Sequence, residues 1–146
     1  MRLPGSVLFA CNHNAIRSPM AAAMLRQLHA RRIFVDSVGV RPLPIDPFAV
    51  AVMDELGISL RDHVSKSFED LEDLSFDLVI SLTPEAQHSA VELTRSMACD
   101  VEYWRSFDAT AVEGSRAEIL AAYRSVRDAL WRRVQQRFPA APQGQV

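Results

Sequence analysis

Residues 6–25 read SVLFACNHNAIRSPMAAAML, and this stretch decides how the rest of the chain is interpreted. The apolar run at residues 7–10 follows a Pro-Gly and precedes polar residues, which is typical of a strand buried on both faces. Cys11 ends that run, five residues separate it from Arg17, and Ser-Pro comes next. Ser followed by Pro is a strong signal for the start of a helix. The stretch therefore predicts a strand, a short loop from Cys11 to Arg17, and a helix.

Beyond this stretch, apolar runs that suit strands alternate with segments of helical periodicity. Such an order implies parallel strands joined by right-handed crossovers. The sequence therefore predicts an α/β fold, a three-layer sandwich in which a four-stranded parallel sheet has helices on both faces. The expected strands are residues 7–10, 33–38, 77–82 and 101–104, and the expected helices are residues 18–31, 47–56, 84–95 and 116–138, with a short helical segment within 68–74.

Length and composition favour one ordinary globular domain. The 146 residues, 49% hydrophobic and 23% charged, are enough to bury a core without cross-links. We expect residues 1–138 to form a single domain and residues 139–146 a flexible C-terminal tail. No apolar run approaches the length of about 20 residues that a membrane helix needs. No secretory signal is visible, so a cytoplasmic location is expected.

The net charge and the cysteine content limit the kinds of binding partner that we expect for this chain. A net charge of -2 does not favour nucleic acid. The two cysteines, Cys11 and Cys99, are too few for a disulfide framework, so reduced thiols are expected. Residues 1–35 contain arginines but no Asp or Glu, which makes the Cys11 end attractive to anions. The sequence indicates no metal, no cofactor and no membrane partner, and it leaves the oligomeric state open.

The loop from Cys11 to Arg17 has the features of an oxyanion site. Because it leads into a helix N-terminus, its backbone N–H groups can converge on an anion such as a phosphate. The planar guanidinium of Arg17 matches two phosphate oxygens. Cys11 can then attack as a thiolate, which a helix N-terminus and a nearby cation stabilise. Ser18 either hydrogen-bonds the Cys11 sulfur or caps the helix, and one hydroxyl can do both.

Asp108 is the candidate for giving a proton to the departing alcohol. It follows the expected fourth strand, so it opens at the same sheet edge as Cys11. A carboxylic acid there can protonate the alcohol and later deprotonate the water that hydrolyses a phosphocysteine. Phe107 is expected to form an apolar wall that raises the pKa of Asp108. The alternative is that Asp108 only caps its loop.

The pattern Cys-x5-Arg-Ser-Pro-Met-Ala, led by Val-Leu-Phe-Ala, resembles the signature of the low-molecular-weight protein tyrosine phosphatases and the related arsenate reductases. Similar segments extend over nearly the whole chain, at residues 36–39, 47–58, 62–66 and 123–128. The resemblance implies that Cys11 is the nucleophile, Arg17 the phosphate clamp and Asp108 the general acid. It implies further that the substrate-binding residues are Asn12, His13, Asn14, Ala15, Ile16 and Ser18.

The resemblance also implies supporting residues. Asn14 would take an unusual backbone conformation and brace the loop, Ser37 would hold Asn14 by a hydrogen bond, and His63 would be a supporting loop residue.

Three departures from the family pattern bear on substrate choice. His13 stands where the family usually has Gly, so it either strains the backbone or points its ring at the pocket mouth. Ile16 replaces a second loop cysteine, which removes an intra-loop disulfide. Ala109 and Thr110 follow Asp108 where Pro and aromatic residues are common, so specificity for phosphotyrosine does not follow.

The sequence favours a phosphomonoesterase that acts through a cysteinyl-phosphate intermediate on a phosphorylated protein or a small phosphomonoester. One alternative is an arsenate reductase that uses an external thiol, because only Cys99 remains and Thr83 stands where the thioredoxin-coupled reductases carry a thiol. The other alternative is a non-catalytic module that binds an oxyanion.

Overall fold

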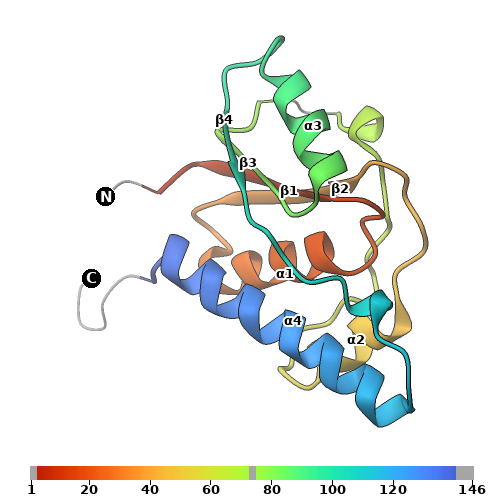
Figure 1. The fold of residues 1–146 in the computed structure, drawn as a ribbon. Coiled ribbons are helices and arrows are strands. Elements are labelled where there is room, and N and C mark those ends of the chain that lie inside the picture. Colours follow the sequence, from red (N-terminus) through yellow and green to blue (C-terminus); the bar gives the residue numbers. More distant parts are fainter. Residues whose placement is uncertain (1–2, 73–74, 141–146) are drawn as a thin grey trace.

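Four parallel strands form one sheet in the order β2-β1-β3-β4 (Figure 1). The computed structural model describes residues 3–72 and 75–140, so residues 141–146 of the expected tail lie outside the described part. The strands are β1 (Ser6–Cys11), β2 (Phe34–Gly39), β3 (Leu78–Ser81) and β4 (Asp100–Tyr103). The helices are α1 (Arg17–His29), α2 (Pro47–Asp54), α3 (Pro84–Leu93) and α4 (Arg116–Arg137), with short 3-10 helices η1 (Phe68–Asp70) and η2 (Ala109–Ala111).

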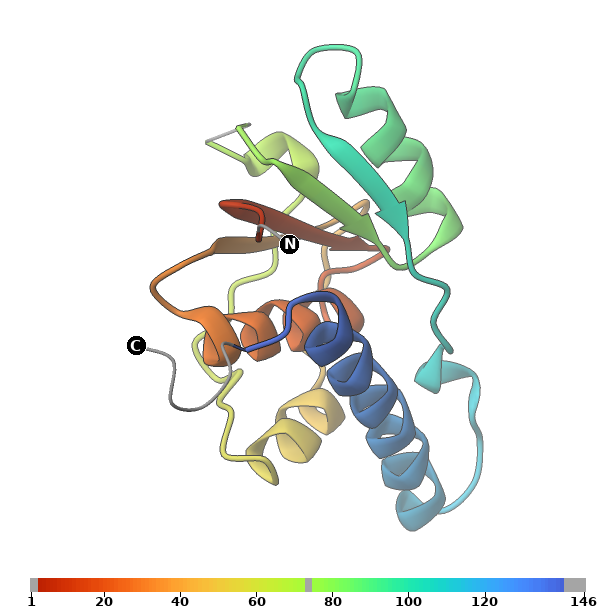
Figure 2. The same cartoon turned by 90° about the vertical axis from the view of Figure 1, so that its left-hand side faces the viewer.

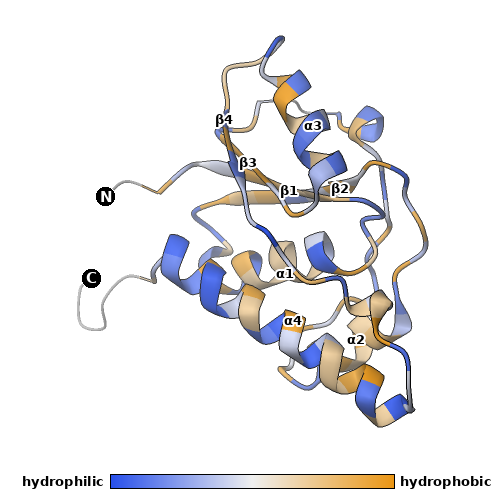
Figure 3. Ribbon diagram, in the orientation of Figure 1, coloured by the Kyte–Doolittle hydropathy of each residue, from blue (hydrophilic) through white to orange (hydrophobic). Residues whose placement is uncertain are grey.

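Helices cover both faces of the sheet, which confirms the predicted three-layer fold. Figures 1 and 2 show α1, α2 and α4 on one face and α3 with η1 on the other. Val7 and Phe9 of β1 pack into the larger core with α1, α2 and α4, whereas Leu8 and Ala10 pack into the smaller core with α3. Because both faces are buried, β1 is apolar at every position and does not alternate. Figure 3 shows hydrophobic residues along the strands and many hydrophilic residues on α4.

Helix α1 begins differently from the prediction. It starts at Arg17, and its N-cap residue Ile16 makes no side-chain capping hydrogen bond. The interpretation of Ser18 as a helix cap is therefore wrong. The Ser18 hydroxyl instead lies 2.9 Å from the Cys11 sulfur, so it is used by the loop.

Other element ends differ from the predicted ones by one or two residues, which is the usual uncertainty of such boundaries. Helix α2 ends at Asp54, and the chain then turns through Gly57, which has φ of 73°. Helix α3 ends at Leu93, where the expected end was residue 95. None of the helices in the described part of the chain is long and apolar enough to span a membrane.

The order of the strands indicates that a ligand would bind at the carboxyl ends of β1 and β3. β1 and β3 are neighbours, but the connection that leaves β1 leads to β2 and the connection that leaves β3 leads to β4, on opposite sides of this pair. In open α/β sheets ligands bind in the crevice formed at such a point. The loop after β1, the segment after β2 and the loop after β4 all meet there (Figure 1).

Candidate active site

The loop between β1 and α1 is held open by hydrogen bonds to its carbonyl oxygens. Four of these oxygens accept N–H groups from residues 40–46: Cys11 O from Val40 (3.1 Å), Asn12 O from Arg41 (2.7 Å), His13 O from Leu43 (3.0 Å) and Ala15 O from Asp46 (3.1 Å). With the carbonyls turned outward, the N–H groups of residues 12, 13, 15 and 16 have no partner among the described residues. Such a run of free N–H groups is a nest for an anion.

Asn14 braces this loop from behind. Among the described residues it is the one non-glycine residue with positive φ, at 51°. Its Nδ2 donates to Ser18 Oγ and to Ser37 Oγ, each at 2.9 Å, and its Oδ1 accepts the N–H of Lys66 at 3.0 Å. Asn14 is fully buried, so these bonds have no competition from water and fix the loop in one conformation.

The carbonyl of Asn14 is held from a third segment. His63 Nε2 lies 2.9 Å and Ser65 Oγ 2.8 Å from Asn14 O. Burial lowers the pKa of His63 and outweighs the hydrogen bond to Asn14, which raises it. A carbonyl only accepts, so Nε2 of His63 carries the hydrogen. His63 therefore supports the loop backbone and does not face the cavity.

Cys11 lies at the floor of the loop with 3% of its surface exposed. Its sulfur is 2.9 Å from Ser18 Oγ and 3.3 Å from the backbone N of Asn14. Ser18 Oγ accepts from Asn14 Nδ2 and also lies 3.3 Å from Val38 O, so its own hydrogen can be donated either to that carbonyl or to the sulfur. Two donors thus face Cys11 Sγ, an arrangement that stabilises a thiolate.

Residues at the ends of the two neighbouring strands also contact the loop between β1 and α1. At Gly39 an added Cβ would lie 2.6 Å from Asn14 N and 2.7 Å from His13 C, so only glycine lets β2 approach the loop. At the end of β3, Thr83 Oγ1 donates to Asn12 Oδ1 at 2.6 Å. Neither residue was predicted to belong to the site, because neither contact has a local signal in the sequence.

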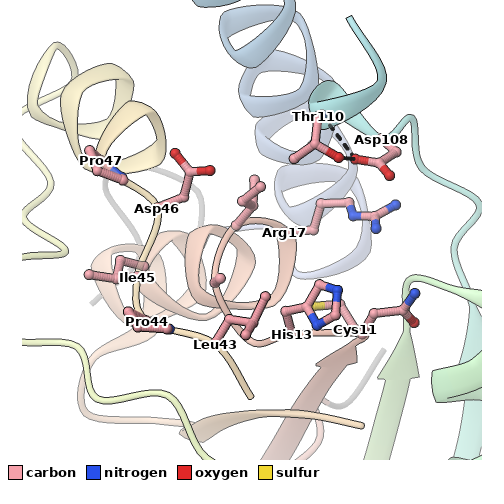
Figure 4. A pocket seen from close by; sticks show the side chains of 13 residues that line it. Cys11, His13, Arg17, Leu43, Pro44, Ile45, Asp46, Pro47, Asp108 and Thr110 are labelled. Atoms are coloured by element: carbon pink, nitrogen blue, oxygen red, sulfur yellow. Dashed lines mark hydrogen bonds between the residues drawn. The ribbon is translucent and has the colours of Figure 1, made fainter. Parts of the chain in front are cut away.

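A cavity of about 490 Å³ opens above the loop. Figure 4 shows Cys11, His13 and Arg17 on its floor and wall, with Asp108 and Thr110 on another side. Of the predicted site residues, those that line the cavity are Cys11, Asn12, His13, Ala15, Ile16, Arg17 and Asp108. Those that do not line it, and instead support the loop, are Asn14, Ser18, Ser37 and His63.

One wall of the cavity was missed from the sequence. It consists of residues 43–47, and Thr110 lines the opposite side. The sequence predicted a helix from residue 47 and assigned none of these residues to the site. The strand order could have predicted this wall, because a segment that follows β2 must pass the carboxyl end of β1.

Arg17 is half-buried and reaches toward the loop after β4. Its Nη1 lies 3.4 Å from both the carbonyl oxygen and the Oγ of Ser106. Ser106 Oγ in turn donates to Leu82 O at 3.0 Å. The guanidinium is therefore held at the cavity by weak contacts that a bound anion can replace.

Asp108 lines the cavity and also caps its own loop. Its Oδ1 accepts the N–H (2.9 Å) and the hydroxyl (2.6 Å) of Thr110, so it caps η2. Partial burial raises the pKa of Asp108, but the hydrogen bonds from Thr110 and the charges of Arg17 and His13 lower it, and the net shift is downward.

The prediction that Phe107 forms an apolar wall beside Asp108 is wrong. The structure leaves Phe107 58% exposed and outside the cavity lining, so it does not shield the Asp108 carboxyl.

A model of the family described as low molecular weight phosphotyrosine protein phosphatase matches residues 6–141. The chain belongs to this family. Among curated relatives, the glutaredoxin arsenate reductase of Synechocystis sp. is 37% identical over 76 residues, which cover 52% of this chain and 58% of that protein. The arsenate reductase of Halalkalibacterium halodurans is 29% identical over 128 residues, covering 88% of this chain and 91% of that protein.

Solved structures of the family agree on the fold. The tyrosine phosphatase AmsI of Erwinia amylovora has a TM-score of 0.74 at 20% identity, covering 92% of this chain and 91% of that chain. An arsenate reductase in the phosphate-binding state has a TM-score of 0.69 at 28% identity, covering 90% and 94%. Proteins similar to this chain are thus named as phosphatases and as arsenate reductases, and one of these arsenate reductases has been solved in a phosphate-binding state.

Proposed function

We propose that the protein is a phosphomonoesterase that works through a cysteinyl-phosphate intermediate. The observation that carries the proposal is the position of the Cys11 sulfur beneath a nest of free N–H groups, in a cavity that it shares with Arg17 and Asp108. The nest and the guanidinium together offer donors to the three non-bridging oxygens of a phosphoryl group. They also stabilise the charge that develops in the transition state.

In the first step the Cys11 thiolate attacks phosphorus and the bond from phosphorus to the ester oxygen breaks. The leaving alcohol takes a proton from the Asp108 carboxylic acid. In the second step water attacks the phosphocysteine, loses a proton to the Asp108 carboxylate and releases phosphate and the thiolate. Ser18 donates to the sulfur at both steps.

The test is steady-state hydrolysis of 4-nitrophenyl phosphate by the wild type, Cys11→Ser and Asp108→Asn. We expect Cys11→Ser to lose activity by at least about 1000-fold, because it removes the nucleophile. We expect Asp108→Asn to lose more activity with phenyl phosphate than with 4-nitrophenyl phosphate, because phenol is the poorer leaving group. If the wild type releases no phosphate above the Cys11→Ser blank while still binding phosphate, the protein is an oxyanion-binding module.

A second candidate function is arsenate reduction. The position of Cys99 favours a mechanism with an external thiol over one in which a second cysteine of this chain attacks Cys11. Cys99 directly precedes β4, at the amino end of the sheet, whereas Cys11 is at the carboxyl end of β1. Burial and the charge of Asp100 raise the pKa of Cys99, which keeps it a thiol.

In this reaction the Cys11 thiolate displaces a hydroxyl group of arsenate, which leaves as water, and forms a sulfur–arsenic bond. The external thiol then attacks the Cys11 sulfur, the sulfur–arsenic bond breaks with both electrons on arsenic, and arsenite leaves as the two sulfurs are oxidised to a mixed disulfide, which a second external thiol reduces. Coupled reduction of arsenate with glutathione or thioredoxin, beside the phosphatase assay, separates the two functions.

A further inference from the structure

A second cavity, of about 200 Å³, is lined by α4 and by the segment that joins β4 to η2. Figure 2 shows these two parts of the chain side by side. Ser106 and Phe107 line the cavity from that segment, whereas Asp108, the next residue, lines the catalytic cavity. Among the described residues, none lines both cavities. The second cavity is therefore a separate site, and the proposed reaction does not use it.

The floor of the second cavity is apolar. It consists of Trp104, which directly follows β4, and of Val126, Ala129 and Leu130 on α4. Trp104, Val126 and Leu130 are each at most 4% exposed, so the core beneath holds them in place. Phe107 lies beside them with more than half of its surface exposed. An apolar ligand in this cavity would remove part of that surface from water, which favours binding.

The polar groups of this cavity are cationic or neutral. Arg105 and Arg133 line it together with Ser106 and Ser125, and no Asp or Glu among the described residues does so. The Arg133 guanidinium lies over the Trp104 ring, 5.0 Å from its centre. Arg105 is exposed, and no hydrogen bond or ion pair engages its side chain within residues 3–72 and 75–140. The catalytic cavity differs, because two carboxylates line it.

The carboxylate that interacts with Arg133 already has other partners. Glu102 accepts the Nε1–H of Trp104 at 3.1 Å and lies 2.8 Å from Nη2 of Arg137. Burial raises the pKa of Glu102, but hydrogen bonds and the charges of Arg137 and Arg133 lower it, and the net shift is downward. Glu102 does not line the cavity. Arg105 is therefore left as a donor for an anionic ligand.

We propose that this second cavity binds a small carboxylate with a flat apolar body. The body lies against Trp104 and Leu130, and the two carboxylate oxygens accept from the planar guanidinium of Arg105. Pockets for drug-sized ligands measure about 300–1,000 Å³, so a cavity of about 200 Å³ suits a ligand with a single ring. A cationic ligand would be repelled by the two arginines.

The test follows the amide NMR signals of the wild type during titration with phenylacetate, its neutral analogue phenylacetamide, and acetate. Inorganic phosphate is present throughout, so that the Cys11 loop is filled. We expect phenylacetate to bind at least about tenfold more tightly than either other probe, because phenylacetamide lacks the charge and acetate lacks the apolar body. Signals of residues 105–107 and 125–133 should shift. Equal affinity for phenylacetate and phenylacetamide, or shifts confined to residues 12–16, would overturn the proposal.

Three variants separate the charge of the cavity from its shape. Arg105→Gln should weaken phenylacetate binding about tenfold, whereas Arg132→Gln, which removes an exposed charge of α4 outside the cavity, should leave it unchanged. Ala129→Leu fills the cavity from an exposed position that tolerates a larger side chain, so it should abolish binding of both aromatic probes. Equal losses in the two arginine variants would show an effect of net charge alone and overturn the proposal, as would unchanged binding in Ala129→Leu.

Discussion

The back of the Cys11 loop and the mouth of its cavity differ in how their polar groups are satisfied. At the back, Asn14, Ser18 and Ser37 are at most 2% exposed, and Asn14 donates a hydrogen bond to each of the two serines. At the mouth, His13 and Asp108 are accessible and each has a ring nitrogen or a carboxylate oxygen free for a ligand. A buried network tolerates little change, whereas exposed groups can vary without disturbing it. The back therefore holds the oxyanion geometry, and the mouth is where substrate choice can change.

Of the changes that test this difference between back and mouth, Gly39→Ala has the largest expected effect. The new Cβ would lie 2.6 Å from the backbone N of Asn14, which cannot move without displacing the loop. We expect kcat/KM to fall by at least about 100-fold, because small displacements of positioned groups cost that much. We also expect a destabilisation of about 1–3 kcal/mol from overpacking.

The matched control is Gly5→Ala, where the nearest atom is a side-chain oxygen of Asp77 at 3.2 Å. Thermal unfolding and 4-nitrophenyl phosphate kinetics of both variants check the prediction. Equal behaviour of the two variants would show that the approach of β2 to the loop is not needed.

An intermediate effect is expected for Ser37→Ala. This change removes one acceptor from Asn14 Nδ2 and leaves the bond to Ser18. The loss of one buried hydrogen bond should cost about 1–2 kcal/mol of stability and about tenfold in kcat/KM. Ser96→Ala, at an exposed position, is the control and should leave both quantities close to wild type. Full activity of Ser37→Ala would show that catalysis does not need the hydrogen bond from Asn14 to Ser37.

The smallest effect is expected at the mouth, for Thr110→Val. Hydrogen bonds from Thr110 stabilise the charged Asp108 carboxylate, so they lower its pKa. Removing the hydroxyl should raise that pKa, and the protonated acid should then persist to higher pH. We expect the alkaline limb of the kcat profile for phenyl phosphate to move to higher pH with little loss of stability. An unchanged or downward-shifted limb would contradict the assignment of Asp108 as the acid.

Local patterns predicted the fold class and the centre of the site. β1 is apolar throughout because both of its faces are buried, and that run was readable as a strand. The spacing from Cys11 to Arg17 and the Ser-Pro after it predicted a loop entering a helix, although the helix begins one residue earlier than expected. The family match confirms the resemblance that this motif suggested. The roles of the individual residues stay predictions that the variants above can test.

What the sequence by itself determined is the set of groups within one short segment: a cysteine, an arginine and the N–H groups of the loop between them. Only the tertiary structure decided which way those N–H groups face, because the carbonyls are turned outward by residues 40–46, which follow a different strand. It also decided that Thr110, and not Phe107, controls the Asp108 carboxyl. Such contacts depend on strand order and on loops that meet at one sheet edge, and no local sequence pattern encodes them.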